Sequence, residues 1–117
     1  MAVIVEIRNP NDFEEKIKRK IDSGLIETWT IDDDGDYTHT PAQWVCKAWM
    51  HLFKMSDISD CDKNKLVFGI IGNKQVQMTK SLYAVYHGRF AEMLLAHFDD
   101  EIDKIVITSN KTDEDFF

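Results

Sequence analysis

Four side chains of one apolar segment could together bind an anion. They are Tyr86, His87, Arg89 and His97. If residues 79–98 form a helix, 100° per residue places Arg89 on the apolar side beside Leu82 and Met93. A buried guanidinium is costly unless it is paired. The segment therefore predicts one of two roles. Either it forms an anion pocket, in a ligand-binding domain or enzyme, or Arg89 is structural and pairs with Glu92, pairs with a carboxylate of the sheet, or reaches the edge of the packed face.

A second group of candidate residues is an acidic run with a glycine, Asp32-Asp33-Asp34-Gly35-Asp36. Carboxylates around a glycine suit Ca²⁺, but with Gly35 as the sixth loop position the first is Thr30 and the twelfth is Pro41. A calcium loop needs carboxylates at both positions. The run is then either the solvated tip of a hairpin or a surface for a cationic partner.

Aromatic side chains lie close to this acidic run along the chain. Trp29, Tyr37, Trp44 and Trp49 fall within 21 residues. Tryptophan often fills a core, but aromatic residues rimmed by charge are also typical of protein-binding hot spots. The predicted partner-binding residues are Trp29, Asp32, Asp33, Asp34, Asp36, Tyr37 and Trp49.

Metal, cofactor and nucleophile patterns are weak. His39, His51, Cys46 and Cys61 lack the short spacings of zinc sites. If Cys46 and His51 share a strand, they face opposite sides. Phosphate-loop, dinucleotide, nucleophile-elbow and zinc-protease motifs do not occur. We expect no metal, no cofactor and no catalytic residue.

Composition limits the class of protein. The 117 residues carry a net charge of −7, with 44% hydrophobic and 30% charged residues, which indicates one globular domain rather than disorder. The acidic excess argues against binding to nucleic acid. Five carboxylates and no cation lie within 27–36, and four within 99–103. No apolar run approaches the roughly 18 residues of a membrane span, and no leader is recognisable. With two cysteines, expected reduced, we predict a cytoplasmic protein.

The pattern of apolar residues predicts an α+β fold. Val3, Val5 and Ile7 alternate as in a strand, and Asp34-Gly35 is a strong hairpin signal. Thr79 can cap a long core helix, and Gly88 within it suggests either close approach of another element or a kink. The expected elements are strands at 1–7, 25–31, 36–39, 43–54, 66–71, 74–78 and 102–109, helices at 10–23 and 79–98, and a polar loop at 55–64.

The segment 43–54 is ambiguous, because Trp44, Ala48 and Leu52 also suit a helix. We favour the strand. The predicted fold is a single α+β domain, residues 1–109, with an antiparallel or mixed sheet of about five to six strands and both helices (10–23 and 79–98) packed on one face. Residues 110–117 are expected to form an acidic, frayed C-terminal tail.

Three function classes follow. The first is a non-enzymatic acidic protein-binding domain, such as an inhibitor or immunity-type protein for a basic partner like a nuclease toxin. The second is the ligand-binding domain or enzyme with its pocket at Arg89, His87 and His97. The third is a homo-oligomeric assembly subunit that pairs through an edge strand. We favour the first, because it alone uses the concentrated acidic charge.

Overall fold

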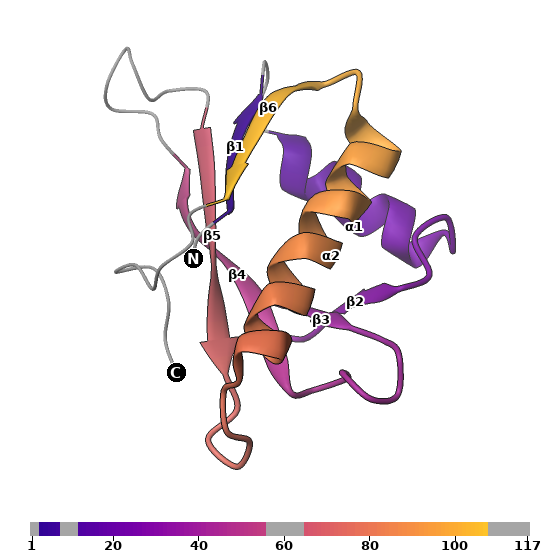
Figure 1. Cartoon of the computed structure of the whole chain (residues 1–117). Coiled ribbons are helices and arrows are strands. Elements are labelled where there is room, and N and C mark those ends of the chain that lie inside the picture. The colour runs from indigo at the N-terminus through magenta and orange to yellow at the C-terminus, as the bar shows by residue number, and fades with distance from the viewer. Residues whose placement is uncertain (1–2, 8–11, 56–64, 108–117) are drawn as a thin grey trace.

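Alternating apolar residues produce the strands of one sheet, and a long, largely apolar helix packs against one face of it. The computed structural model describes residues 3–7, 12–55 and 65–107. In chain order the elements are β1 (Val3–Ile7), α1 (Phe13–Asp22), β2 (Trp29–Ile31), β3 (Tyr37–His39), β4 (Ala48–Met55), β5 (Lys65–Gly72), α2 (Lys80–Phe98) and β6 (Ile102–Ile107) (Figure 1).

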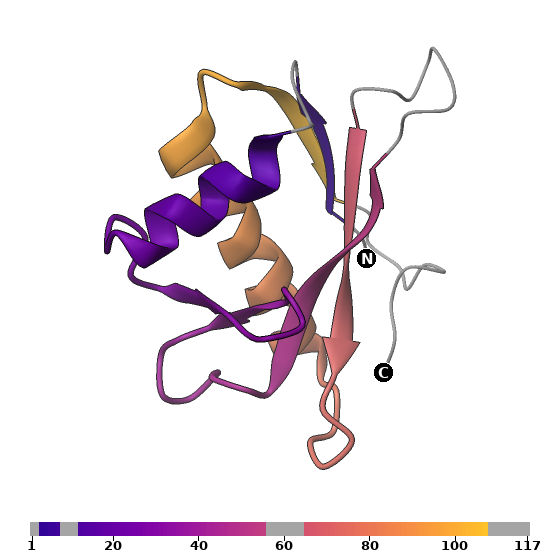
Figure 2. The same ribbon diagram turned by 180° about the vertical axis from the view of Figure 1, so that it is seen from behind.

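The six strands form one antiparallel sheet in the order β2-β3-β4-β5-β1-β6. Strands β2 to β5 are a meander, and the first strand of the chain inserts between β5 and the last strand. Both helices lie on the same side of the sheet (Figures 1 and 2). The prediction of one α+β domain with two helices on one face of the sheet is confirmed.

Alternation along the strands determines which side chains meet the helices. Every second residue of β1 is buried, and Leu66, Phe68 and Ile70 of β5 are buried in the same way. These side chains lie under α2, whose buried residues are Leu82, Tyr86, His87, Phe90, Ala91, Met93, Leu94 and Phe98. The core therefore lies between one face of the sheet and α2.

Helix α1 is held by a narrow apolar stripe and by contacts with the end of α2. Phe13 and Ile17 are buried, and the rings of Phe13 and Phe98 meet edge to face at 4.9 Å. Lys20 Nζ donates to the His97 carbonyl at 2.6 Å. The helix ends where Gly24 takes a φ of +85°, a conformation that glycine adopts without strain. The part of the predicted helix at residues 10 and 11 lies outside the described residues.

The predicted hairpin is confirmed. Trp29 pairs with His39, and Ile31 pairs with Tyr37. Strand β2 is shorter than the predicted 25–31, because the chain after α1 first hydrogen-bonds back to the helix: Ile26 N–H donates to the Lys20 carbonyl at 3.1 Å. A backbone group used in this way cannot pair with β3.

Two predicted strands change in the structure. The strand interpretation of 43–54 holds only from Ala48, because Pro41 starts a turn in which its carbonyl accepts from Trp44 N–H at 2.8 Å. The strand predicted at 74–78 is wrong. The side-chain oxygen of Asn73 accepts from Gln75 N–H at 2.9 Å, and the backbone carbonyl of Asn73 accepts from Val76 N–H at 3.0 Å. These local hydrogen bonds compete with strand pairing.

The long helix begins as predicted, because the Thr79 hydroxyl accepts from Leu82 N–H at 3.1 Å. Across the described residues, neither helix combines the length and the apolar character that crossing a membrane requires. The final strand, predicted over 102–109, is described to Ile107, and the tail 110–117 lies outside the described residues.

Gly88 lies in the middle of α2 with open space around it. A Cβ added there meets nothing within 4 Å, so the close approach of another element that the sequence suggested is wrong. We expect Gly88→Ala to raise the free energy of unfolding by about 0.5–1 kcal/mol, because alanine loses less backbone entropy in a helix. Urea unfolding measures the change. A loss of stability would show that the position needs glycine.

Candidate functional site: an acidic cleft

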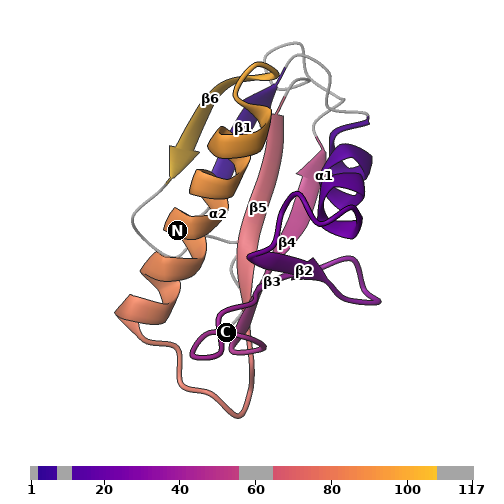
Figure 3. The same cartoon turned by 90° about the vertical axis from the view of Figure 1, so that its right-hand side faces the viewer.

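A cleft of about 540 Å³ opens between α1 and the β2–β3 hairpin. In Figure 3, α1 and the β2–β3 hairpin lie near each other on the right-hand side of the molecule. We call the space between them the acidic cleft. Its lining residues are Glu14, Glu15, Lys18, Asp22, Ile31, Asp32, Asp33, Asp34, Gly35, Asp36, Tyr37, His51 and Leu52.

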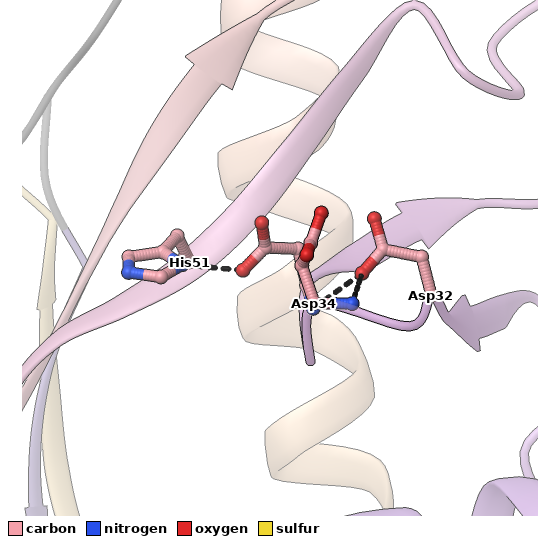
Figure 4. Close-up of polar contacts among 4 residues, drawn as sticks. Asp32, Asp34 and His51 are labelled. Carbon is pink, nitrogen blue, oxygen red and sulfur yellow. Dashed lines mark hydrogen bonds and ion pairs between the residues drawn. The ribbon is translucent and has the colours of Figure 1, made fainter.

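The turn of the hairpin has a defined backbone. The Asp32 carboxylate accepts from Asp34 N–H at 3.0 Å and from Asp36 N–H at 2.9 Å (Figure 4). Gly35, with a φ of +84°, donates from its N–H to the Asp32 carbonyl at 3.0 Å. The Asp36 carboxylate pairs with Nδ1 of His51 on β4. The acidic run is therefore held in one shape rather than being a loose tip.

The charge of the cleft is strongly one-sided. Seven carboxylates line it, against the single cation Lys18 and the imidazole of His51. Three of the seven come from α1 and its last turn, namely Glu14, Glu15 and Asp22. No group of three or more His, Cys, Asp or Glu side chains among the described residues is arranged to hold a metal ion. The cleft therefore presents a strongly negative surface.

Burial affects the carboxyl group of Glu14. Loss of hydration raises its pKa above the ordinary value, His51 lowers it, and Glu15 and Asp36 raise it further. Glu14 thus resists ionisation because it is partly buried beside like charges. A cation in the cleft would favour the ionised form of Glu14 and so offset both effects.

The raised pKa of Glu14 predicts that ionisation of this carboxyl lowers the free energy of unfolding. Below the unfolded pKa of about 4.3 the carboxyl is protonated in both states and has no such effect, and the loss of stability develops as pH rises through the folded pKa. We expect Glu14→Gln to raise the free energy of unfolding at about pH 7 and to leave it nearly unchanged at about pH 3. Urea unfolding at both pH values tests this.

The exposed Glu15 gives a matched control, since Glu15→Gln makes the same charge change without the burial. A gain of equal size at both pH values for Glu14→Gln would contradict a role for its ionisation.

The Tyr37 phenol lines the acidic cleft from the core side. Its side chain has 0% exposure, and its ring contacts that of Phe90 at 5.4 Å. The hydroxyl has no hydrogen-bond partner among the described residues. Burial, followed by the charges of Glu14 and Asp36, raises the pKa of this phenol above its ordinary value. The group is therefore a neutral hydroxyl next to two acidic side chains.

The structure divides the predicted partner-binding residues. Asp32, Asp33, Asp34 and Asp36 all line the cleft. Trp29 is 1% exposed, and its ring contacts those of Tyr86 at 5.5 Å and Phe90 at 5.3 Å. Trp29 therefore belongs to the core and is not part of an exposed aromatic surface.

The other two tryptophans lie away from the cleft. Trp49 is half-buried and pairs with Ile71 on β5; by alternation it faces away from the buried Ala48 and Met50. Trp44 lies half-buried in the turn before β4. The four aromatic residues near the acidic run thus do not form one patch.

The alternative anion pocket lacks the buried arginine that it requires. Arg89 is exposed and donates to Glu92 at 2.9 Å, so its predicted place on the apolar face is wrong. The buried side chains of α2 centre near Phe90 and Leu94, about a third of a turn from Arg89. The structural alternative, pairing with Glu92, is confirmed.

The remaining members of that group make structural contacts. The Tyr86 hydroxyl donates to the Trp44 carbonyl at 2.6 Å. His87 is buried, and its Nδ1 donates to the Tyr83 carbonyl at 2.7 Å. The ring of His97 lies 6.5 Å from that of Phe98. Tyr86, His87, Arg89 and His97 do not converge on a common space.

Sequence reasoning missed the helical half of the cleft. Glu14, Lys18 and Asp22 recur every four residues and so share one face of α1. Such a face usually meets only solvent, and nothing in the sequence places it opposite the hairpin turn. The sequence indicates His51 only as a possible metal ligand or as a partner of Cys46, whereas the structure pairs it with Asp36.

The structure describes three of the four zinc and disulfide candidates. His39 Nδ1 donates to the Thr28 carbonyl at 2.9 Å, Cys46 is an exposed free thiol, and Cys61 lies outside the described residues.

Comparisons of this chain with protein-family models, curated proteins and solved structures found no match.

Proposed function

We propose that this protein is a non-enzymatic binding domain whose acidic cleft receives a basic segment of a protein partner. The observation that carries the proposal is the gathering of seven carboxylates from α1 and the β2–β3 hairpin around one cleft that has a single lysine. Charges that repel one another in the free protein attract a cationic partner, accelerate its association and favour it over acidic competitors.

An inhibitor of a cationic enzyme is the partner relationship that suits this surface best. Enzymes that act on nucleic acid, such as nuclease toxins, carry clustered lysines and arginines that bind the phosphate backbone. An acidic cleft can occupy the same cationic groups and compete with the nucleic acid. The rings of Trp29 and Tyr37 are buried and so do not give this surface the aromatic contacts expected from the sequence.

Two paired variants test the proposal. The probe is a short arginine-rich peptide, and binding is measured by calorimetry at low and high salt. We expect Asp33→Asn with Asp34→Asn to weaken binding at low salt by about threefold for each carboxylate removed, and high salt to reduce the difference. Asp99→Asn with Asp100→Asn makes the same charge change at exposed positions outside the cleft and should have little effect.

Two results would overturn the proposal. One is an absence of binding by the unchanged protein at low salt. The other is equal weakening by the two paired variants, which would mean that the peptide responds to net charge and not to the acidic cleft.

A homo-oligomeric assembly role remains a second candidate, favoured by one observation. Strand β6 is at the edge of the sheet and exposes Val106 and Ile107, and an edge strand offers unpaired backbone groups to another chain. Light scattering across a concentration series tests it, and a constant monomer mass would reject it.

A further inference from the structure

Tyr37 lines the acidic cleft, and its hydroxyl group makes no hydrogen bond to the described residues. This hydroxyl is fully buried. Burying a hydroxyl without a partner opposes folding. The contrast with Tyr86, whose hydroxyl donates to the Trp44 carbonyl at 2.6 Å, shows that this core can satisfy a phenol. The free hydroxyl of Tyr37 is therefore a feature that a ligand could complete.

The surroundings of this hydroxyl specify the chemistry of such a ligand. Glu14 and Asp36 are the two charged groups that act on the Tyr37 phenol, and both line the same cleft. One side of Asp36 is already occupied by His51. A ligand group that satisfies Glu14, Asp36 and the Tyr37 hydroxyl must carry a positive charge for the two carboxylates. It must also have at least one hydrogen to donate to the phenol oxygen.

A guanidinium meets these requirements better than an ammonium. It presents five N–H donors in a planar fork, matches carboxylates bidentately and is less strongly hydrated. An ammonium is a compact, strongly hydrated charge that gains less from a partly buried position.

We infer that the acidic cleft recognises a single arginine of the basic partner, whose guanidinium lies between Glu14 and Asp36 and donates a hydrogen bond to the Tyr37 hydroxyl. The inference rests on the proposed function and adds the residue type that the cleft selects. Tyr37 is then a specificity-determining residue, and Asp33 and Asp34 at the turn supply attraction that does not distinguish arginine from lysine.

Three otherwise identical peptides test the selectivity. Each contains one variable residue, which is arginine, lysine or citrulline, the neutral isostere of arginine. Titration is followed by NMR of the full chain with labelled tyrosine rings and carboxyl groups. We expect the arginine peptide to shift the Tyr37 and Glu14 signals, the lysine peptide to bind about tenfold more weakly, and the citrulline peptide not to bind.

Tyr37→Phe removes the proposed acceptor and leaves the ring in place. We expect it to weaken the arginine peptide by about tenfold and to affect the lysine peptide much less, so that the preference for arginine disappears. Tyr83→Phe is the matched control on α2, outside the cleft, and should preserve the preference. Thermal unfolding verifies that each variant is folded.

The outcomes separate the two proposals. If basic peptides bind the cleft but arginine and lysine bind equally, or if Tyr37→Phe keeps the preference for arginine, the inference is overturned and the proposed function stands. If no basic peptide binds, both fail. If the unchanged protein prefers the arginine peptide, and Tyr37→Phe loses this preference while Tyr83→Phe keeps it, the result supports both the proposed function and the inference.

Discussion

Replacing Phe90 with alanine is expected to lower the free energy of unfolding by about 3–5 kcal/mol. Phe90 is fully buried on α2, and its ring meets those of Phe68 at 4.9 Å, Trp29 at 5.3 Å and Tyr37 at 5.4 Å. These neighbours lie on three different strands and cannot collapse together into the space that the ring leaves. The loss combines transfer of the ring with an unfilled cavity.

The expected loss is a large part of the total free energy of unfolding of an ordinary domain, which is about 5–15 kcal/mol. Chemical denaturation at equilibrium measures it. Leu95→Ala is the control on the same helix: Leu95 is 51% exposed, and we expect a change within about 0.5 kcal/mol. Similar losses for the two variants would contradict the assignment of the core to the Phe90 side of α2.

Removing the hydroxyl groups of the two buried tyrosines is expected to change stability in opposite directions. The Tyr86 hydroxyl donates to the Trp44 carbonyl at 2.6 Å, accepts from His39 N–H at 3.4 Å and lies 3.0 Å from Thr38 Oγ1. Tyr86→Phe removes these hydrogen bonds, and we expect a loss of about 1–3 kcal/mol, although the Trp44 carbonyl still accepts from Lys47 N–H and Thr38 Oγ1 still bonds to Ala48 and Cys46.

Tyr37→Phe removes a hydroxyl that has no partner in the described part of the chain. We expect this variant to be as stable as the unchanged protein or up to about 2 kcal/mol more stable, because it no longer buries an unsatisfied group. Both variants are measured by urea unfolding at neutral pH. Destabilisation by Tyr37→Phe of the size expected for Tyr86→Phe would show that the Tyr37 hydroxyl is satisfied in the free protein.

A gain in stability accompanied by loss of arginine binding is a pattern seen at many functional sites, where groups arranged for a ligand are costly in its absence. The same reasoning applies to Glu14, which is partly buried beside Glu15 and Asp36. Two groups of one cleft, the Tyr37 hydroxyl and the ionised Glu14 carboxyl, then lower the stability of the free protein.

Much of the fold follows from local sequence. The alternation of Val3, Val5 and Ile7 predicts β1, Asp34-Gly35 predicts the hairpin, and Thr79 predicts the start of α2. These signals are strong because they depend on backbone geometry and on neighbours a few residues away. The failed strand at 74–78 has a local cause too, in hydrogen bonds of Asn73 that a periodicity argument does not see.

The side chains of α2 mark the limit of a helical wheel. The wheel places Arg89 next to Leu82, but the sheet packs against the side centred on Phe90, which leaves Arg89 at the edge with Glu92. Periodicity indicates how apolar residues are spaced around a helix. It does not indicate which part of a broad apolar surface the rest of the protein covers.

The sequence by itself determined the α+β class, the order of most elements and the acidic run that forms one wall of the cleft. Only the tertiary structure decided that Glu14, Glu15 and Asp22 form the opposite wall, that His51 pairs with Asp36, and that Trp29 is core. The reason is that α1 docks through Phe13 and Ile17 onto the core. The position of its acidic face is set by that packing between residues distant in sequence, which no local pattern of charge encodes.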